Sequence, residues 1–170
     1  SICIYDEPHE TERQSLQSDD VFLVSGGGSG VTASCIVGLA NANQDVGVHF
    51  ALLGRTKLDE KLEGKASASD EELQEMKMAL RERMQNEMGK VTIVEWEKEW
   101  SLIVRSIDIH KTLFAIRQTG NTASYHGCDV TESKQIRQVL KKLKKKRNPV
   151  TGIIHGAGIE DSKLVSDKDW

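Results

Sequence analysis

The glycine cluster at residues 26–30 is the part of the sequence whose residue types and spacing can bind an anion. It follows the apolar run VFLVS at residues 21–25 and precedes TASCIVGLANAN at residues 32–43, which carries apolar residues at helical spacing. Glycine lets a backbone approach a ligand closely, and the unpaired amides at a helix start attract negative charge. We interpret the cluster as a cradle for nucleotide phosphates; the alternative is a tight turn that binds nothing.

A cation follows the second apolar run, GVHFALLGR at residues 47–55. An NAD site would place Asp or Glu at this point to accept hydrogen bonds from the ribose hydroxyls. Arg55 instead offers a planar, fork-shaped cation that suits a 2′-phosphate. The residue type therefore favours NADP(H), and an exposed surface arginine is the alternative.

Small and acidic residues end the two later apolar runs, TASYHGCDV at residues 122–130 and VTGIIHGAG at residues 150–158. Asp129 can accept a hydrogen bond from an adenine amino group, or it can cap the next helix; the sequence leaves both open. The small residues after His155 would let a ribose lie against the backbone. His155 by itself is more typical of a hydrogen-bonded strand-end side chain than of a catalyst.

These segments belong to an alternation of strands and helices that predicts an α/β fold. The order is strand, helix, strand, two helices, strand, helix, strand, with the last helix at residues 132–147. Right-handed crossovers then give a Rossmann-like parallel sheet of order 3-2-1-4 with helices on both faces. The ligand crevice of such a sheet opens at the carboxyl ends of strands 1 and 4. Both glycine turns, at residues 26–30 and 156–158, follow those strands.

The predicted helices each have an apolar stripe that we expect to be buried. On the first helix, Cys35 is expected to pack in the core. The charged segment of about residues 57–94 is expected to contain an amphipathic helix, followed by a second one over about residues 95–119. The residues of these two stripes are Leu73, Met76, Leu80, Met84 and Met88, then Trp96, Trp100, Ile103, Val104, Ile107 and Phe114. In the helix at residues 132–147, Ile136, Val139, Leu140 and Leu143 are expected to face inward.

The composition is that of a water-soluble globular domain. The chain has 170 residues, 38% hydrophobic and 29% charged, with a net charge of −3. No apolar run approaches the roughly 20 residues that a bilayer span needs, and the net charge does not favour a nucleic-acid partner. The three widely spaced cysteines are typical of free thiols in a reducing cytoplasm and predict no metal site. Residues 1–18 are expected to be a polar lead-in.

Four motifs resemble, in the same order, those of ketoreductase domains in polyketide and fatty-acid megasynthases, which are short-chain dehydrogenases/reductases. They are VFLVSGGGSGVT, ALLGRT, YHGCDVTE and GIIHGAGIEDSKL. The glycine spacing is similar to the TGxxxGxG pattern of that superfamily, with Ser25 in the threonine place and Thr32 in place of the third glycine. The GGGSGVT form and the helical insert, about residues 57–94, are most similar to multienzymes that make polyunsaturated fatty acids. The resemblance covers about residues 20–170.

The resemblance implies the nucleotide-binding part of an NADPH-dependent β-ketoacyl-acyl carrier protein reductase, over residues 19–170. It implies Arg55 at the 2′-phosphate and Asp129 with Val130 at the adenine. The other implied cofactor contacts are Gly26, Gly28, Gly30 and Val31 at the pyrophosphate and His155, Gly156 and Ala157 beside the nicotinamide.

No catalytic residue is assigned. The family's active-site serine, tyrosine and lysine come after the point where this chain stops, and neither Tyr5 nor Tyr125 has a lysine four residues later. We therefore expect an incomplete domain from a longer polypeptide, inactive alone, with neighbouring domains as partners. Its fourth strand would be an exposed edge through which copies could associate.

Two other functions stay open at this point. One is a structural Rossmann-like subdomain that binds no cofactor. The other is an epimerase or dehydratase with the same nucleotide loop. A phosphate-seeking Arg55 beside an open glycine loop favours cofactor binding over the structural role.

Overall fold

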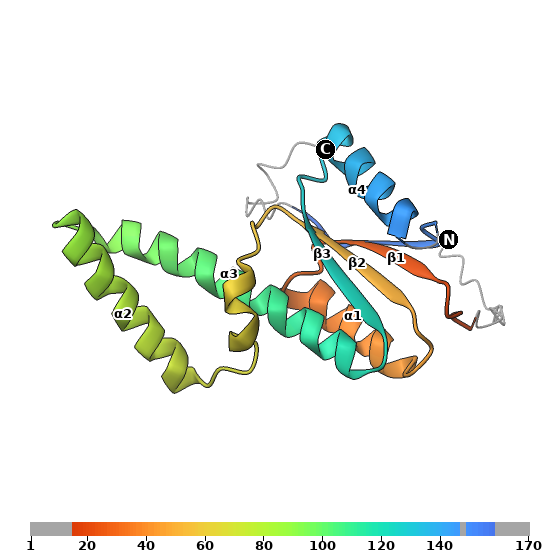
Figure 1. Ribbon diagram of the computed structural model, residues 1–170, viewed down its shortest axis with the longest axis horizontal. Helices are drawn as coiled ribbons and strands as arrows, with labels where there is room; N and C mark the ends of the chain where they lie inside the picture. Colours follow the sequence, from red (N-terminus) through yellow and green to blue (C-terminus); the bar gives the residue numbers. More distant parts are fainter. Residues whose placement is uncertain (1–14, 147–148, 159–170) are drawn as a thin grey trace, which may run out of the picture.

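A computed structural model of the chain describes residues 15–146 and 149–158. Residues 1–14 of the predicted lead-in, including Tyr5, and residues 159–170 lie outside the described residues. The elements, drawn in Figure 1, are β1 (Val21–Ser25), α1 (Gly30–Ala42), β2 (His49–Gly54), the 3₁₀ helix η1 (Glu60–Lys65), α2 (Asp70–Met88), α3 (Ile93–Gln118), β3 (Thr122–Gly127), α4 (Ser133–Lys146) and β4 (Gly152–His155).

The four strands form one parallel sheet in the order β3-β2-β1-β4, as the alternation of strands and helices predicts. The register pairs Ser25 at the end of β1 with Leu53 on β2 and with His155 on β4. Since all strands run in the same direction, their carboxyl ends meet at one edge of the sheet. The turns that follow β1, β2, β3 and β4 are thereby brought together.

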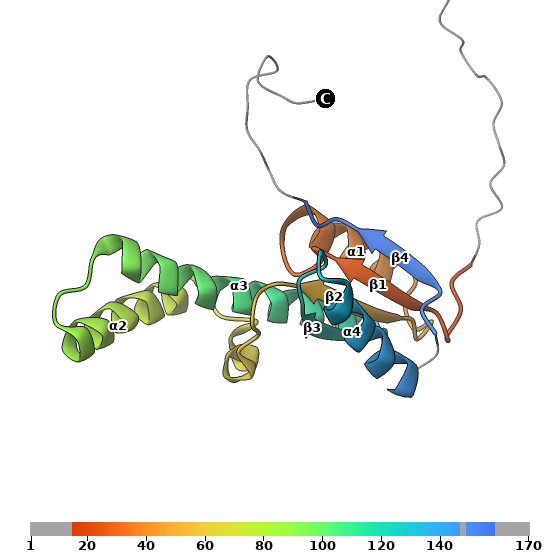
Figure 2. The ribbon, with the colours of Figure 1, turned by 90° about the horizontal axis from the view of Figure 1, so that it is seen from above.

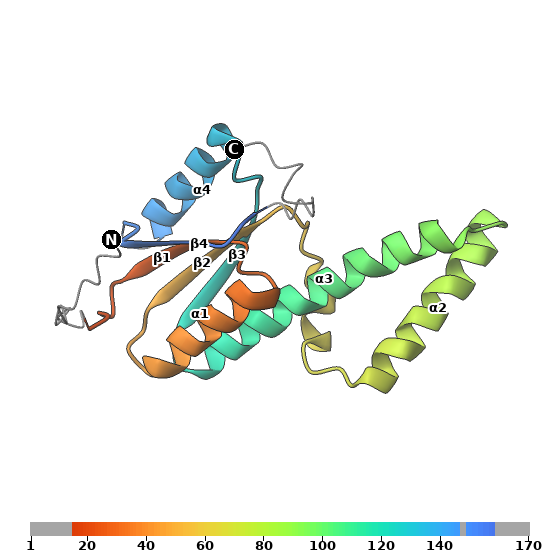
Figure 3. The same ribbon diagram turned by 180° about the vertical axis from the view of Figure 1, so that it is seen from behind.

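Helices cover both faces of the sheet because the central strands are apolar on both sides. In Figure 3, α1 and the second half of α3 lie on one face and α4 lies on the other. The first face buries Val24, Phe50 and Leu52 under residues from α1 and α3. The second buries Leu23, Ala51 and Leu53 under α4 residues. Such two-sided burial explains why β1 and β2 read as continuous apolar runs.

A helical hairpin, made of α2 and the first half of α3, extends away from the sheet (Figures 1 and 2). Each helix begins with a capping box, formed by Ser69 with Glu72 and by Thr92 with Glu95. Trp96 of α3 joins the two helices, because its indole N–H donates to the Lys77 carbonyl (3.3 Å) and the Lys77 ammonium lies 4.8 Å from its ring centre. Within the described residues, no helix combines the length and apolarity needed to span a membrane.

The apolar stripe of α3 is divided between two neighbours, which corrects one prediction. The first half turns Trp96 and Ile103 toward α2 and leaves Trp100 half-buried, whereas the second half packs on the sheet through Ile109, Leu113 and Ile116. At 3.6 residues per turn these two sets lie on nearly opposite sides of the helix. Phe114 continues the first stripe beyond the reach of α2. Its expected burial is therefore wrong, and its side chain is 51% exposed.

Three other expected core positions are exposed. Cys35 points to solvent although its helix neighbour Ile36 is fully buried, because α1 turns only a narrow face to the sheet. Met88, the last residue of α2, is 67% exposed, and Leu140 on α4 is 37% exposed.

Candidate functional site

The turns that follow β1 and β4 lie against each other at the carboxyl edge of the sheet. The Gly156 amide donates to the Ser25 carbonyl (3.0 Å). Gly26 has a positive φ of 74°, and a Cβ at this position would lie 2.7 Å from the carbonyl carbon and oxygen of Gly156. A side chain at Gly26 would therefore force the two turns apart.

Ser25 and Thr32 join the same two turns, and neither was assigned to the site from the sequence. The Ser25 hydroxyl is hydrogen bonded to the His155 ring Nδ1 (2.5 Å) and accepts from the Ala157 amide (3.3 Å). The Thr32 side chain occupies the space where a Cβ on Gly156 would lie. Thr32 fits at a position where a glycine was expected because Gly156, far away in sequence, has no side chain. Only the pairing of β1 with β4 brings these residues together.

Six of the sequence-predicted cofactor residues surround one open cavity of about 490 Å³ at this edge. They come from the turns after all four strands. The cavity is lined by Gly26, Leu53, Gly54, Arg55, Cys128, Asp129, Val130, Thr131, Gly156, Ala157 and Gly158.

The other four predicted residues do not line this cavity. Gly28 faces α3, where a Cβ would lie 2.9 Å from the Ile109 side chain, so the missing side chain serves helix packing. Gly30 and Val31 begin α1 on the open surface, where Val31 is 81% exposed. The side chain of the N-cap residue Ser29 makes no bond to the first turn of α1, so the amides of that turn are available to an anion. His155 is the last residue of β4. Its side chain is exposed, and its ring is hydrogen bonded to the Ser25 hydroxyl.

The Asp129 carboxylate is ionised and fixed in place. Its Oδ1 accepts from the Thr131 amide (2.9 Å) and hydroxyl (2.7 Å). These bonds, with a smaller effect of the Arg55 charge, hold the pKa of Asp129 below its ordinary value. Because α4 begins at Ser133, Asp129 closes a turn before the helix and is not its N-cap.

Tyr125 anchors the segment that carries Arg55. Its hydroxyl donates to the Thr56 carbonyl (2.8 Å), and the Cys128 amide donates to the Gly54 carbonyl (2.8 Å). Burial raises the pKa of Tyr125. The phenol is thereby engaged in holding the loop after β2.

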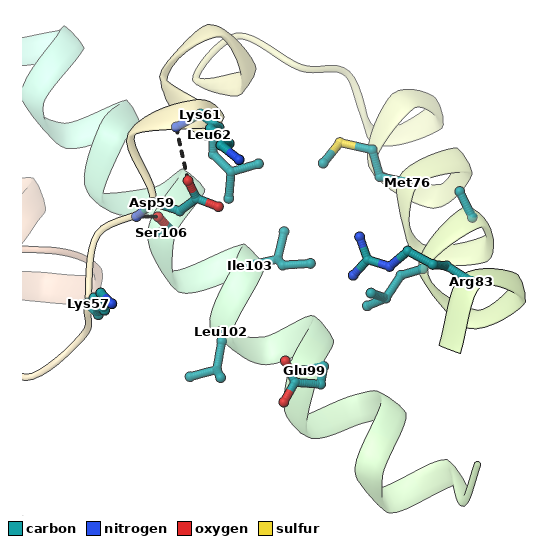
Figure 4. A pocket seen from close by; sticks show the side chains of 12 residues that line it. Lys57, Asp59, Lys61, Leu62, Met76, Arg83, Glu99, Leu102, Ile103 and Ser106 are labelled. Carbon is teal, nitrogen blue, oxygen red and sulfur yellow. Dashed lines mark hydrogen bonds between the residues drawn. The ribbon is translucent and has the colours of Figure 1, made fainter. Parts of the chain in front are cut away.

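A larger cavity, of about 610 Å³, lies within the helical hairpin (Figure 4). Met76 and Arg83 of α2 face Ile103 of α3 across it, and Glu99 also lines it. None of the predicted cofactor residues lines it, although Lys57 and Asp59 of the segment after β2 do. No group of His, Cys, Asp or Glu suited to a metal ion occurs in the part of the chain that the structure describes.

The sequence model of the KR domain family matches residues 21–170. This chain belongs to the ketoreductase (KR) domain family. The chain is also 28% identical, over 95% of its length, to one of the subunits of the polyunsaturated fatty acid synthase of Thraustochytrium sp., and it covers 6% of that protein. The short chain thus corresponds to a small part of a large multidomain relative.

Solved structures share the fold of this KR domain. A ketoreductase domain from the bacillaene assembly line superposes with a TM-score of 0.56 at 19% identity, covering 94% of this chain and 27% of that one. An N-terminal ketoreductase from the macrolactin assembly line gives 0.53 at 17% identity, covering 91% and 22%. These matches agree with the Rossmann-like parallel sheet that the sequence predicts.

Proposed function

We propose that this KR domain binds NADPH and is the nucleotide-binding part of a β-ketoacyl-acyl carrier protein reductase in a fatty acid or polyketide synthase. One observation carries the proposal. Residues from the turns after all four strands, distant in sequence, surround a single cavity at the carboxyl edge of the sheet. This edge is where doubly wound folds bind their ligands.

The residues around the cavity fit the parts of NADPH. Arg55 is exposed, and no carboxylate among the described residues lies within 4.0 Å of it, so its guanidinium is available for the 2′-phosphate. Asp129 and Val130 suit the adenine, with a carboxylate as acceptor and an apolar side chain. Gly26 supplies a backbone surface without a side chain, and the uncapped start of α1 at Gly30 and Val31 suits the pyrophosphate.

When bound, NADPH would supply the hydride for ketone reduction. The role of this chain's residues is to hold and orient the cofactor: Arg55 binds one end, and the Ser25 hydroxyl fixes the turn with Gly156 and Ala157 on the side proposed for the nicotinamide. We further propose that the substrate is a β-ketoacyl chain bound to acyl carrier protein and that the domain is located in the cytoplasm.

Cofactor titration of the chain and of Arg55→Ala tests the proposal. We expect the parent chain to bind NADPH more tightly than NADH. Arg55→Ala removes the proposed bidentate partner of the 2′-phosphate, so it should weaken NADPH binding by about tenfold or more. NADH binding should change little, because NADH has no 2′-phosphate. Isothermal titration calorimetry or NADPH fluorescence measures both dissociation constants.

The outcome also separates the alternatives. A folded chain that binds neither cofactor would favour the structural subdomain. Equal binding of NADPH and NADH by the parent chain and by Arg55→Ala would contradict the assignment of Arg55. An epimerase or dehydratase would share the binding result, and only its lack of ketone reduction in a longer polypeptide would distinguish it.

A further inference from the structure

A second, smaller hollow of about 370 Å³ adjoins the cofactor cavity and shares Arg55, Cys128 and Asp129 with it. Two further side chains line this hollow but not the cofactor cavity: Lys57, from the segment after β2, which also borders the hairpin cavity, and Gln135, from the first turn of α4. Lys57 was given no role from the sequence. It lies two residues after the arginine that is proposed to bind the 2′-phosphate.

The charges around the hollow show why one cation is not sufficient. Arg55 and Asp129 are close enough to interact electrostatically, and the Asp129 carboxylate is ionised. Without Lys57, the lining charges of Arg55 and Asp129 would cancel, so a phosphate would gain little net attraction. With Lys57 included, the hollow has a net positive charge, as a dianionic phosphate needs.

Hydrogen bonds fix two parts of the lining of the hollow: the backbone that presents both cations, and the turn at Asp129. Thr56, between Arg55 and Lys57, accepts the Tyr125 hydroxyl (2.8 Å). On the opposite wall, the Gln135 Oε1 accepts from the Asp129 amide (2.9 Å), which orients the Gln135 amide group at the hollow. A site with its backbone already fixed loses less conformational entropy when a ligand binds.

We propose that Lys57 is a second phosphate-binding cation beside Arg55, and that its charge is required for preference of the 2′-phosphate over a free ribose hydroxyl. This inference rests on the proposed NADPH function and adds the residue that sets the sign of the charge at that end of the cofactor.

The test compares Lys57→Gln, Lys57→Arg and Lys61→Gln with the parent chain. Lys61 is a matched control, since it is an exposed lysine on η1 that does not line the hollow (Figure 4). Titrations with NADPH and with NADH, each at low and at high salt, give the dissociation constants. Lys57→Gln should weaken NADPH binding about threefold to fivefold, near the upper range for an exposed charge pair. NADH binding should change less than twofold.

The remaining variants decide the interpretation. Lys57→Arg should keep NADPH binding, Lys61→Gln should match the parent, and the salt dependence of NADPH binding should become weaker in Lys57→Gln. If Lys57→Gln keeps the preference for NADPH, or weakens the binding of NADPH and NADH equally, the proposed role of Lys57 is wrong. The proposal that the chain binds NADPH is not affected by that result. If the folded parent binds neither cofactor, the proposed function itself fails.

Discussion

At the scale of single residues, the glycines of this KR domain differ in whether the structure has room for a side chain at their position. Gly26 has a positive φ, and a Cβ added to it would lie 2.7 Å from the Gly156 backbone, whereas a Cβ added to Gly38, on α1, would meet no atom within 4 Å. The same substitution should therefore have opposite effects at these two positions.

We expect Gly26→Ala to destabilise the fold by about 2 kcal/mol or more, because it adds backbone strain and a clash at the β1–β4 junction. Gly38→Ala should stabilise the fold by about 0.5–1 kcal/mol through helix propensity. Urea unfolding of both variants measures the difference. A loss of stability in both would show that α1 does not tolerate a side chain at Gly38.

At the scale of elements, the stability of the hairpin depends on the capping boxes that begin its two helices. The Thr92 hydroxyl donates to the Glu95 carboxylate (2.7 Å), which also accepts from the Thr92 amide (2.9 Å). These bonds lower the pKa of Glu95 below its ordinary value of 4.5. The stabilisation is present above that ordinary value and is lost as the pH falls through the lowered value of the folded state.

Thr92→Ala should lower the free energy of unfolding by about 1 kcal/mol near neutral pH, as is typical of a lost N-cap side chain. The difference from the parent chain should shrink as the pH falls below 4.5, because protonation of Glu95 weakens the bond from the Thr92 hydroxyl to the carboxylate, which Thr92→Ala also removes. Urea unfolding at pH 7 and pH 4 provides the measurement. Ser101→Ala, within α3, is the control and should show no such pH dependence; an equal loss at both pH values would contradict the role of Glu95.

At the scale of the whole molecule, the described sheet has an uncovered flank. Among the described residues, β4 pairs only with β1. Ile153 lies beside Leu23 in the register, yet α4 covers Leu23 and leaves Ile153 74% exposed. An apolar edge strand of this kind tends to pair with another chain.

We predict that the chain alone self-associates as its concentration rises, and that Ile153→Lys reduces this association by placing a charge on the edge. Light scattering after size-exclusion chromatography measures the mass. Val94→Lys, at a hairpin position that is 78% exposed, should leave the association unchanged. If only Val94→Lys lowers the mass, copies associate through the hairpin instead.

The sequence by itself determined the alternation of elements, the parallel order 3-2-1-4 and the edge of the sheet that carries the glycine turns. Apolar runs, helical spacing and glycine clusters are local, and right-handed crossovers leave few topologies for them. For the same reason Arg55 and Asp129 could be placed at strand ends before any contact was known.

Only the tertiary structure decided which residues meet. The fit of Thr32 against Gly156 and the link from Ser25 to Ala157 join residues more than a hundred positions apart. The exposure of Phe114 depends on where α2 stops covering α3, and the hollow of Lys57 depends on the start of α4. Packing between distant segments sets these contacts, and no local pattern in the chain records them.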